Sequence, residues 1–157
     1  MELKGNLLRL AGAGAAIALS ATPLFGAPSA QAAPVVNYQV VNGNSRNACL
    51  QVVNAHTGTG NVVLATCDRS AKQVWRIGGG IFRNPASNHC LDGNGTDVYT
   101  KRCNTDGYQK WKTTSGSPKY INQDRGGKYL HAAGRVGEHV VYKPSSGTSS
   151  RWVIGRV

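Results

Sequence analysis

Apolar residues in this 157-residue chain gather in short runs that are separated by clusters of Gly, Asn, Ser and Pro. From residue 33 onward, no segment sustains the 3.6-residue apolar spacing of a helix. Short runs rich in Val, Ile and Tyr between turn residues are typical of β-strands. The strand-like runs are Val35–Val41, Val62–Thr66, Ile81–Phe82, Val98–Thr100, Tyr120–Ile121 and Val140–Tyr142. Such strands at regular spacing predict an all-β sandwich or barrel.

Three landmarks recur in the same order along the chain. A triplet is followed by a phrase that centres on Leu, and that phrase is followed by a Trp; the tryptophans lie 36 and 41 residues apart and the leucines 41 and 39. The landmarks are Val40-Val41-Asn42, Leu50 and Trp75, then Phe82-Arg83-Asn84, Leu91 and Trp111, then Tyr120-Ile121-Asn122, Leu130 and Trp152. This register predicts three repeats of about 40 residues, near 35–77, 78–115 and 116–157. A three-fold repeat favours a closed arrangement, which protects strand edges.

The first two tryptophans end a Gln-x-Trp phrase, Gln73-Val74-Trp75 and Gln109-Lys110-Trp111. A buried Trp contributes roughly 150–250 Å² of surface, so three related tryptophans would form one shared apolar centre. The Gln two places earlier can satisfy backbone groups at a bend between strands. The phrase therefore predicts a fold more strongly than it predicts a ligand.

Residues 1–32 have the organisation of an export signal. Lys4 and Arg9 precede a mild apolar run, and Ala30-Gln31-Ala32 fits a cleavage site. The run Leu10–Leu19 is too short and too rich in Gly and Ala to span a bilayer stably. We therefore expect a secreted protein with one domain over 33–157 and no membrane span, and the richness in Ala and Gly favours a bacterial origin. An amphipathic first helix or a membrane anchor is the alternative.

Charge and composition narrow the function classes. The chain has 18 basic and 7 acidic residues, and removing residues 1–32 takes away two bases and one acid, which leaves a net charge of +10. A basic surface favours an anionic glycan, an anionic cell envelope or a nucleic acid as partner, and export makes nucleic acid the least favoured. Generic solubilising charge is the simplest alternative. The short chain with 20 Gly disfavours a large enzyme, a multidomain machine and a polytopic membrane protein.

The exported part contains four cysteines, Cys49, Cys67, Cys90 and Cys103. In an oxidising compartment an even number indicates disulfides, and four cysteines allow three pairings. No Cys-x-x-Cys spacing occurs, and no His lies at a zinc-site interval from a Cys pair. We expect no metal and no other cofactor.

Cys90-Leu91-Asp92, then Cys103, then Gln109-Lys110-Trp111 resembles the repeat of the ricin B-chain-type (QxW) β-trefoil lectins. The three repeats extend this resemblance over nearly all of residues 33–157. It implies a β-trefoil, a six-stranded barrel capped by three hairpins. It also implies binding of sugars, usually galactose-like, without catalysis, and such domains often target toxins or polysaccharide-degrading enzymes.

The repeat and the family arrangement together select one disulfide pairing. Cys49 would pair with Cys67 and Cys90 with Cys103, each within one repeat. In the third repeat, Tyr129 and Pro144 take the corresponding places, so we expect no bridge there.

The resemblance also implies where a sugar would bind. In the family, the Asp of Cys-Leu-Asp takes sugar hydroxyls, an aromatic residue two places before the second Cys stacks on the ring, and an Asn before the Gln of Gln-x-Trp adds a hydrogen bond. The first repeat has Gln51, Ala65 and Lys72 at these positions. We expect it to be silent, because Ala65 offers no stacking face.

No repeat carries the full set of sugar-binding residues. The second keeps Asp92 and Gln109 but has Lys101 at the aromatic position and Tyr108 at the Asn position, and Tyr99 or Tyr108 could provide the stacking face instead. The third has Tyr142 at the stacking position, with His131 replacing Asp and Ser149 replacing Asn. The candidate carbohydrate-binding residues are therefore Asp92, Gln109, Tyr108, Tyr142 and His131. The structural alternatives are a solvated turn residue for Asp92, a half-buried strand residue for Tyr142 and a surface histidine for His131.

Catalysis finds little support in the sequence. No G-x-S-x-G, H-E-x-x-H or phosphate-binding loop is present, and we assign no catalytic residue. The main expectation is a secreted carbohydrate-binding module for a diverged or anionic glycan, such as a cell-surface polysaccharide. The alternative is a protein-interaction trefoil that escorts a secreted enzyme or toxin subunit, similar to the accessory subunits of cytolethal distending toxins. A protease inhibitor is a third possibility.

Overall fold

The computed structural model of this chain describes residues 34–55 and 58–157, so the predicted export signal lies outside the described residues. These residues form twelve β-strands and three short 3-10 turns, η2 (Ala71–Gln73), η3 (Gly107–Gln109) and η4 (Thr148–Ser150). The strands are β1 (Tyr38–Asn42), β2 (Ala48–Val53), β3 (Thr59–Thr66), β4 (Arg76–Gly78), β5 (Ile81–Asn84), β6 (His89–Gly93), β7 (Val98–Arg102), β8 (Trp111–Thr113), β9 (Lys119–Gln123), β10 (Tyr129–His131), β11 (Val141–Lys143) and β12 (Arg151–Arg156). Within this part of the chain, no helix has the length and apolar character needed to cross a membrane.

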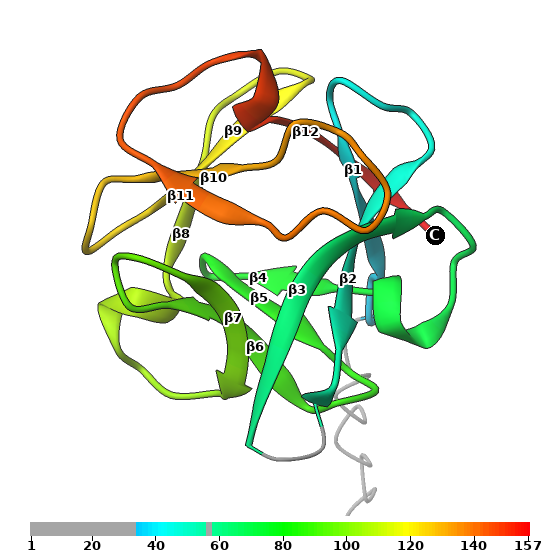
Figure 1. The fold of residues 1–157 in the computed structure, drawn as a ribbon. Helices are drawn as coiled ribbons and strands as arrows, with labels where there is room; N and C mark the ends of the chain where they lie inside the picture. The colour runs from blue at the N-terminus through cyan, green and yellow to red at the C-terminus, as the bar shows by residue number, and fades with distance from the viewer. Residues whose placement is uncertain (1–33, 56–57) are drawn as a thin grey trace, which may run out of the picture. The chain divides into compact units, whose positions relative to one another are not determined.

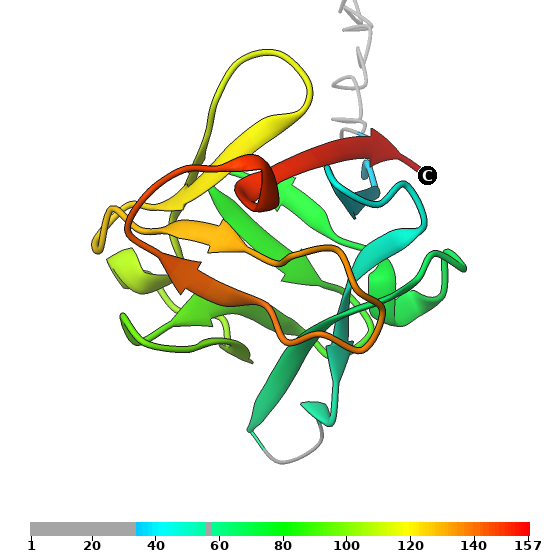
Figure 2. The ribbon, with the colours of Figure 1, turned by 45° about the horizontal axis from the view of Figure 1, so that its top comes forward.

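Six of the strands form a closed barrel. Antiparallel ladders join β1 to β12, β4 to β5, β8 to β9 and β9 to β12. Backbone hydrogen bonds complete the ring, between Tyr38 and Trp75 in both directions and from Trp111 to Gly80. Figure 2 shows β12, in red, beside β1, so the last strand of the chain pairs with the first.

The other six strands form three hairpins, β2–β3, β6–β7 and β10–β11. Figure 1 shows the three hairpins arranged around a common centre. A barrel with three capping hairpins, each set of four consecutive strands giving one third, is the β-trefoil. The prediction of an all-β trefoil fold is confirmed.

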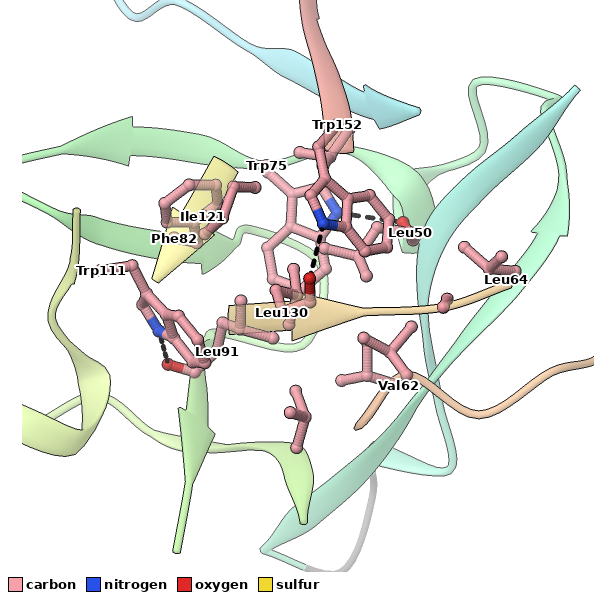
Figure 3. Close-up of a cluster of buried hydrophobic side chains, with 14 of the residues drawn as sticks. Leu50, Val62, Leu64, Trp75, Phe82, Leu91, Trp111, Ile121, Leu130 and Trp152 are labelled. Atoms are coloured by element: carbon pink, nitrogen blue, oxygen red, sulfur yellow. Dashed lines mark hydrogen bonds between the residues drawn. The ribbon is translucent and has the colours of Figure 1, made fainter. Parts of the chain in front are cut away.

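The core has the three-fold repetition that the tryptophans predict. Trp75, Trp111 and Trp152 are at most 2% exposed. The indole Nε1–H of each donates a hydrogen bond of 3.0 Å to the carbonyl oxygen of the Leu in its own repeat, and Figure 3 shows the three bonds, to Leu50, Leu91 and Leu130. A buried indole N–H needs such a partner. The recurring Leu thus contributes its backbone as well as its side chain.

The Gln of Gln-x-Trp ends each of the first two 3-10 turns and is fully buried. The side-chain oxygens of Gln73 and Gln109 accept the backbone N–H of Asp68 (3.0 Å) and Asn104 (2.8 Å). Their amide groups donate to carbonyl oxygens at the end of the preceding strand, at 2.7 and 3.0 Å. Each Gln therefore fixes the bend between the hairpin and the next barrel strand, as its structural interpretation predicts.

Both predicted disulfides are confirmed. Cys49 is bonded to Cys67 and Cys90 to Cys103. Each joins the first strand of a hairpin to the segment that follows its second strand.

Candidate functional site

The second repeat contains a buried pair of an acid and an amide, Asp92 on β6 and Gln109 at the end of η3. The Oδ2 atom of Asp92 accepts a hydrogen bond of 2.7 Å from Nε2 of Gln109, and its Oδ1 atom accepts the backbone N–H of Gly93 at 2.5 Å. Asp92 is only 4% exposed, so it is not a solvated turn residue. The structure brings these two predicted site residues together.

The other repeats hold different chemistry in the same place. In the first, Nε2 of Gln73 donates to Oε1 of Gln51 at 3.0 Å. In the third, Nδ1 of His131 lies 3.2 Å from Oγ of Ser150. Of the three equivalent positions, only that of the second repeat carries a carboxylate.

Two tyrosines accompany the Asp92–Gln109 pair. Tyr99 on β7 lies directly opposite Asp92 in the β6–β7 ladder and therefore on the same face. Burial raises the pKa of the Tyr99 hydroxyl, and the negative charge of Asp92 raises it further. Tyr108 precedes Gln109 in η3 and is half-buried. The carboxylate of Asp92 can thus accept hydrogen bonds from hydroxyl groups, and the rings of Tyr99 and Tyr108 lie in the same repeat.

The surroundings of this site are basic. Lys101 and Arg102 at the end of β7 are exposed. The guanidinium carbon of Arg125, from the β9–β10 connection, lies 4.7 Å from the centre of the Tyr108 ring. Sequence reasoning missed Arg125, because it comes from the third repeat and no local motif links it to Tyr108.

The strand register corrects the position assigned to Tyr142. On β11, Tyr142 lies opposite Leu130, as Leu64 lies opposite Leu50 and Thr100 opposite Leu91. The residue equivalent to Ala65 and Lys101 is therefore Lys143, which lies opposite Tyr129. The prediction that Tyr142 takes the stacking position is wrong by one residue, and so is the placement of Pro144.

Tyr142 instead belongs to the core. It is 7% exposed, and its ring stacks on Trp111 with ring centres 5.7 Å apart. Burial raises the pKa of its hydroxyl far above the ordinary value. The hydroxyl has no hydrogen-bond partner among the described residues. Tyr142 offers no open ring face to a sugar, so it is also not the half-buried residue of the alternative.

His131 does not join Tyr142 in one site. It lies opposite Val141 in the β10–β11 ladder, whereas Tyr142 lies opposite Leu130, so the two side chains point to opposite faces. His131 is half-buried, and burial, followed by the nearby charge of Lys143, lowers its pKa. The predicted pairing of His131 with Tyr142 is wrong for this reason.

No group of three or more His, Cys, Asp or Glu side chains suited to a metal ion occurs in residues 34–55 and 58–157.

The sequence matches the family described as "Ricin-type beta-trefoil lectin domain" over residues 36–152. A search of curated proteins gives no match. Among solved structures, the chain is similar to ThreeFoil, a designed three-fold symmetric protein, with 22% identity and a TM-score of 0.67 over 75% of this chain and 96% of that one. It is also similar to the C-half of the earthworm R-type lectin in complex with GalNAc, with 12% identity and a TM-score of 0.66 over 78% of this chain and 99% of that one.

A third similar structure is an exo-β-1,3-galactanase from Clostridium thermocellum, with 25% identity and a TM-score of 0.67. The match covers 79% of this chain and 31% of the galactanase, so this chain corresponds to about a third of that enzyme's length.

Proposed function

Because the chain belongs to the ricin-type β-trefoil lectin domain family over residues 36–152, we propose that it is a secreted, non-catalytic carbohydrate-binding module whose sugar site lies in the second repeat. The proposal includes export through residues 1–32 with cleavage after Ala32, and a bacterial source. The four candidate residues that it assigns to glycan contact or support are Asp92, Gln109, Tyr99 and Tyr108.

The buried Asp92–Gln109 pair is the observation that supports this site. An ionised carboxylate offers about four lone-pair directions. Gly93 and Gln109 use two of them, so the remaining directions can accept sugar hydroxyls at the narrow accessible edge of Asp92. Gln109 is held in turn by Asn104 and Arg102, which fixes the carboxylate before a ligand arrives. A preorganised acceptor loses little conformational entropy on binding.

The other two repeats lack this combination. The first presents the neutral Gln51 with Ala65 at the stacking position. The third presents His131 with Lys143 at the stacking position and has Tyr142 in the core. We therefore place a single family-type site on the molecule, and His131 supports the fold rather than a ligand.

The proposed ligand is an acidic or sulfated glycan. Arg125 lies over the Tyr108 ring, the exposed Lys101 and Arg102 follow Tyr99 at the end of β7, and the exported part of the chain has a net charge of +10. Exposed cations attract anionic groups, and dissolved salt screens that attraction over about 8–10 Å at physiological ionic strength. Neutral galactosides should bind weakly, because no aromatic residue occupies the stacking position of any repeat.

Titration calorimetry tests the site. The protein would be recovered from the medium of an expressing host, and its intact mass should match a chain that begins at Ala33. It would then be titrated with a sulfated galactan and with lactose, at low and at high salt. We expect binding of the sulfated galactan that weakens at high salt. Asp92→Asn should weaken it at least about tenfold, equivalent to about 1.4 kcal/mol, although it removes a negative charge.

Gln51→Ala at the equivalent position of the first repeat is the matched control and should leave binding unchanged. Thermal melting of each variant checks that it is folded. Equal loss in Asp92→Asn and Gln51→Ala, or stronger binding of the sulfated galactan to Asp92→Asn, would contradict the proposed site.

A further inference from the structure

The three hairpins meet at a cavity that shares one residue, Tyr99, with the proposed site of the second repeat. Its volume is about 360 Å³, and residues of all three repeats line it. The polar side chains at its wall are Thr59 and Asn61 from β3, Asn94, Asp97 and Tyr99 from the β6–β7 hairpin, and His139 from the segment before β11. We call this the axial cavity.

Three equivalent backbone pairings, one from each repeat, surround the cavity. Asn61 lies opposite Tyr99, Asp97 opposite Val141 and His139 opposite Val63. Each pairing joins the second strand of one hairpin, or the one or two residues before it, to the second strand of another, in cyclic order. Asn61, Asp97 and His139 therefore occupy equivalent positions, four residues before Ala65, Lys101 and Lys143.

Three equivalent backbone positions thus place an amide, a carboxylate and an imidazole at the axial cavity. Asn61, Asp97 and His139 are exposed, and none of their side chains makes a hydrogen bond to another described residue. Asn94 is constrained, because its Oδ1 atom accepts the backbone N–H of Thr96 (2.9 Å) and of Asp97 (2.8 Å), while its amide N–H groups stay available. Among these polar groups, the backbone therefore holds Asn94 in place, while the side chains of Asn61, Asp97 and His139 stay available for a ligand.

The lining also has an apolar component. Val98 and Val140, which are almost fully buried, lie at the cavity, and the half-buried ring of Tyr99 forms part of its wall. Donors and acceptors that surround an apolar surface suit a pyranose ring, which has polar edges and apolar faces. An anionic ligand is disfavoured, because Asp97 is the charged group at the cavity and no Lys or Arg lines it. A cation is disfavoured, because a single carboxylate is available to hold it.

We propose that the axial cavity is a second binding site, for one neutral hexose unit of a glycan. Asp97 accepts hydroxyl hydrogens, Asn61 and His139 contact the neighbouring hydroxyls, and Tyr99 contacts the ring. The choice of a carbohydrate rests on the proposed function, but the location does not, since the two sites share Tyr99 alone. Tyr99 lies between Asn61 on one side and Asp92 on the other, so a glycan with a neutral unit beside an acidic one could reach both sites.

Two-dimensional NMR of the exported protein tests the axial cavity, with galactose, glucose, mannose and N-acetylglucosamine added separately, and calcium chloride as a non-sugar probe. We expect at least one hexose to shift the backbone amide signals of Asn61, Asp97 and His139 in a saturable manner. Asp97→Asn should weaken this binding at least fivefold. Asp68→Asn, which makes the same charge change in the first repeat, should not.

Asp92→Asn separates this proposal from the preceding one. It should leave the axial shifts in place while it weakens binding of the sulfated galactan. Shifts at the axial amides with calcium but with none of the sugars would overturn the proposal, as would hexose binding that Asp97→Asn does not weaken. Loss of sulfated galactan binding in Asp92→Asn, with no axial shifts by any hexose, would refute the axial site and leave the proposed function intact.

Discussion

At the scale of single residues, Tyr142 shows how closely site and core are related in this fold. Its neighbour Lys143 is exposed at the position equivalent to Ala65 and Lys101, while Tyr142 points inward onto Trp111. The tyrosine is accommodated by Gly93, since a Cβ atom at that position would overlap the Tyr142 hydroxyl. The absence of a side chain at Gly93 is therefore a packing requirement that depends on a residue of another repeat.

This packing leads to a prediction about Tyr142. Tyr142→Phe keeps the ring on Trp111 and removes a hydroxyl that has no partner among the described residues, so the free energy of unfolding should stay the same or rise by about 1 kcal/mol. Tyr142→Ala should lower it by about 3–5 kcal/mol, because it leaves a cavity. Urea titration measures both values. A loss of more than about 2 kcal/mol in Tyr142→Phe would show that the hydroxyl has a stabilising partner.

Gly93→Ala provides the complementary test. It should destabilise the wild-type protein, and Tyr142→Phe should restore part of the loss, because the overlapping oxygen is then absent. Additive effects of the two substitutions would contradict direct contact.

At the scale of elements, the three hairpins differ from one another in strand length and in cross-linking. The strands of β2–β3 are 6 and 8 residues long, whereas β10 and β11 have 3 residues each. The first two hairpins are closed by disulfides, and the third is not. In the third, Tyr129 replaces the first Cys and packs edge-on against Tyr120, with ring centres 5.8 Å apart. This contact joins β10 to the barrel strand β9 and not to the end of β11, so among the described residues the third hairpin has no cross-link equivalent to the two disulfides.

The disulfides allow a prediction at this scale. The cysteines of the two bridges are 18 and 13 residues apart, and in the chain-entropy model each bridge contributes about 3 kcal/mol. Replacing either pair by Ala should lower the free energy of unfolding by about that amount. Denaturant titration of the double variants Cys49→Ala/Cys67→Ala and Cys90→Ala/Cys103→Ala measures it. An unchanged denaturation midpoint in either variant would show that the bridge does not stabilise the protein by reducing the conformational entropy of the unfolded chain.

At the scale of the whole molecule, the protonation of a few side chains with lowered pKa values, one in each of three separate places, makes the free energy of unfolding depend on pH. Burial lowers the pKa of His131 below 6.5. The backbone N–H of Ser70 lowers the pKa of Asp68, and the hydrogen bond from Lys112 lowers that of Asp124. In each case the unfolded state binds the proton more readily, so acid favours unfolding.

We therefore predict a two-stage loss of stability as the pH falls. The contribution of His131 is present above pH 6.5 and is lost as the pH falls from there through the lowered pKa of the folded state. The contributions of Asp68 and Asp124 are lost below about pH 4. His131→Gln should remove the first stage and keep the second, as measured by melting temperature against pH. A first stage that persists in His131→Gln would assign it to another group.

Much of the fold was predictable from the sequence. The three tryptophans, the leucines and the Gln-x-Trp phrases define the repeat because each makes the same local interaction in its own repeat, either an indole N–H bonded to a Leu carbonyl or an amide that fixes a bend. The cysteines pair within these units. Such short-range interactions leave a sequence signal, and from them the trefoil and both disulfides follow. The Asp92–Gln109 pair of the candidate site was likewise predictable, since both residues lie in one repeat.

The third repeat was misaligned by one residue because it has no second cysteine to mark the end of its hairpin. Along a strand successive side chains point to opposite faces, so a shift of one residue exchanged core and surface and placed Tyr142 in the wrong environment. The triplets show the same effect, since Gln123, rather than Asn122, is the buried equivalent of Asn42 and Asn84. Only the pairing of the strands decides this register.

The sequence by itself thus determined the repeat, the trefoil, the disulfides and the chemistry available in each repeat. The tertiary structure alone decided which residues of different repeats share a space. Arg125 over Tyr108, Gly93 beneath Tyr142, and Asn61, Asp97 and His139 around the axial cavity all join segments from separate repeats. The physical reason is that these contacts depend on how the hairpins close around the three-fold axis, and no local pattern of residues records that closure.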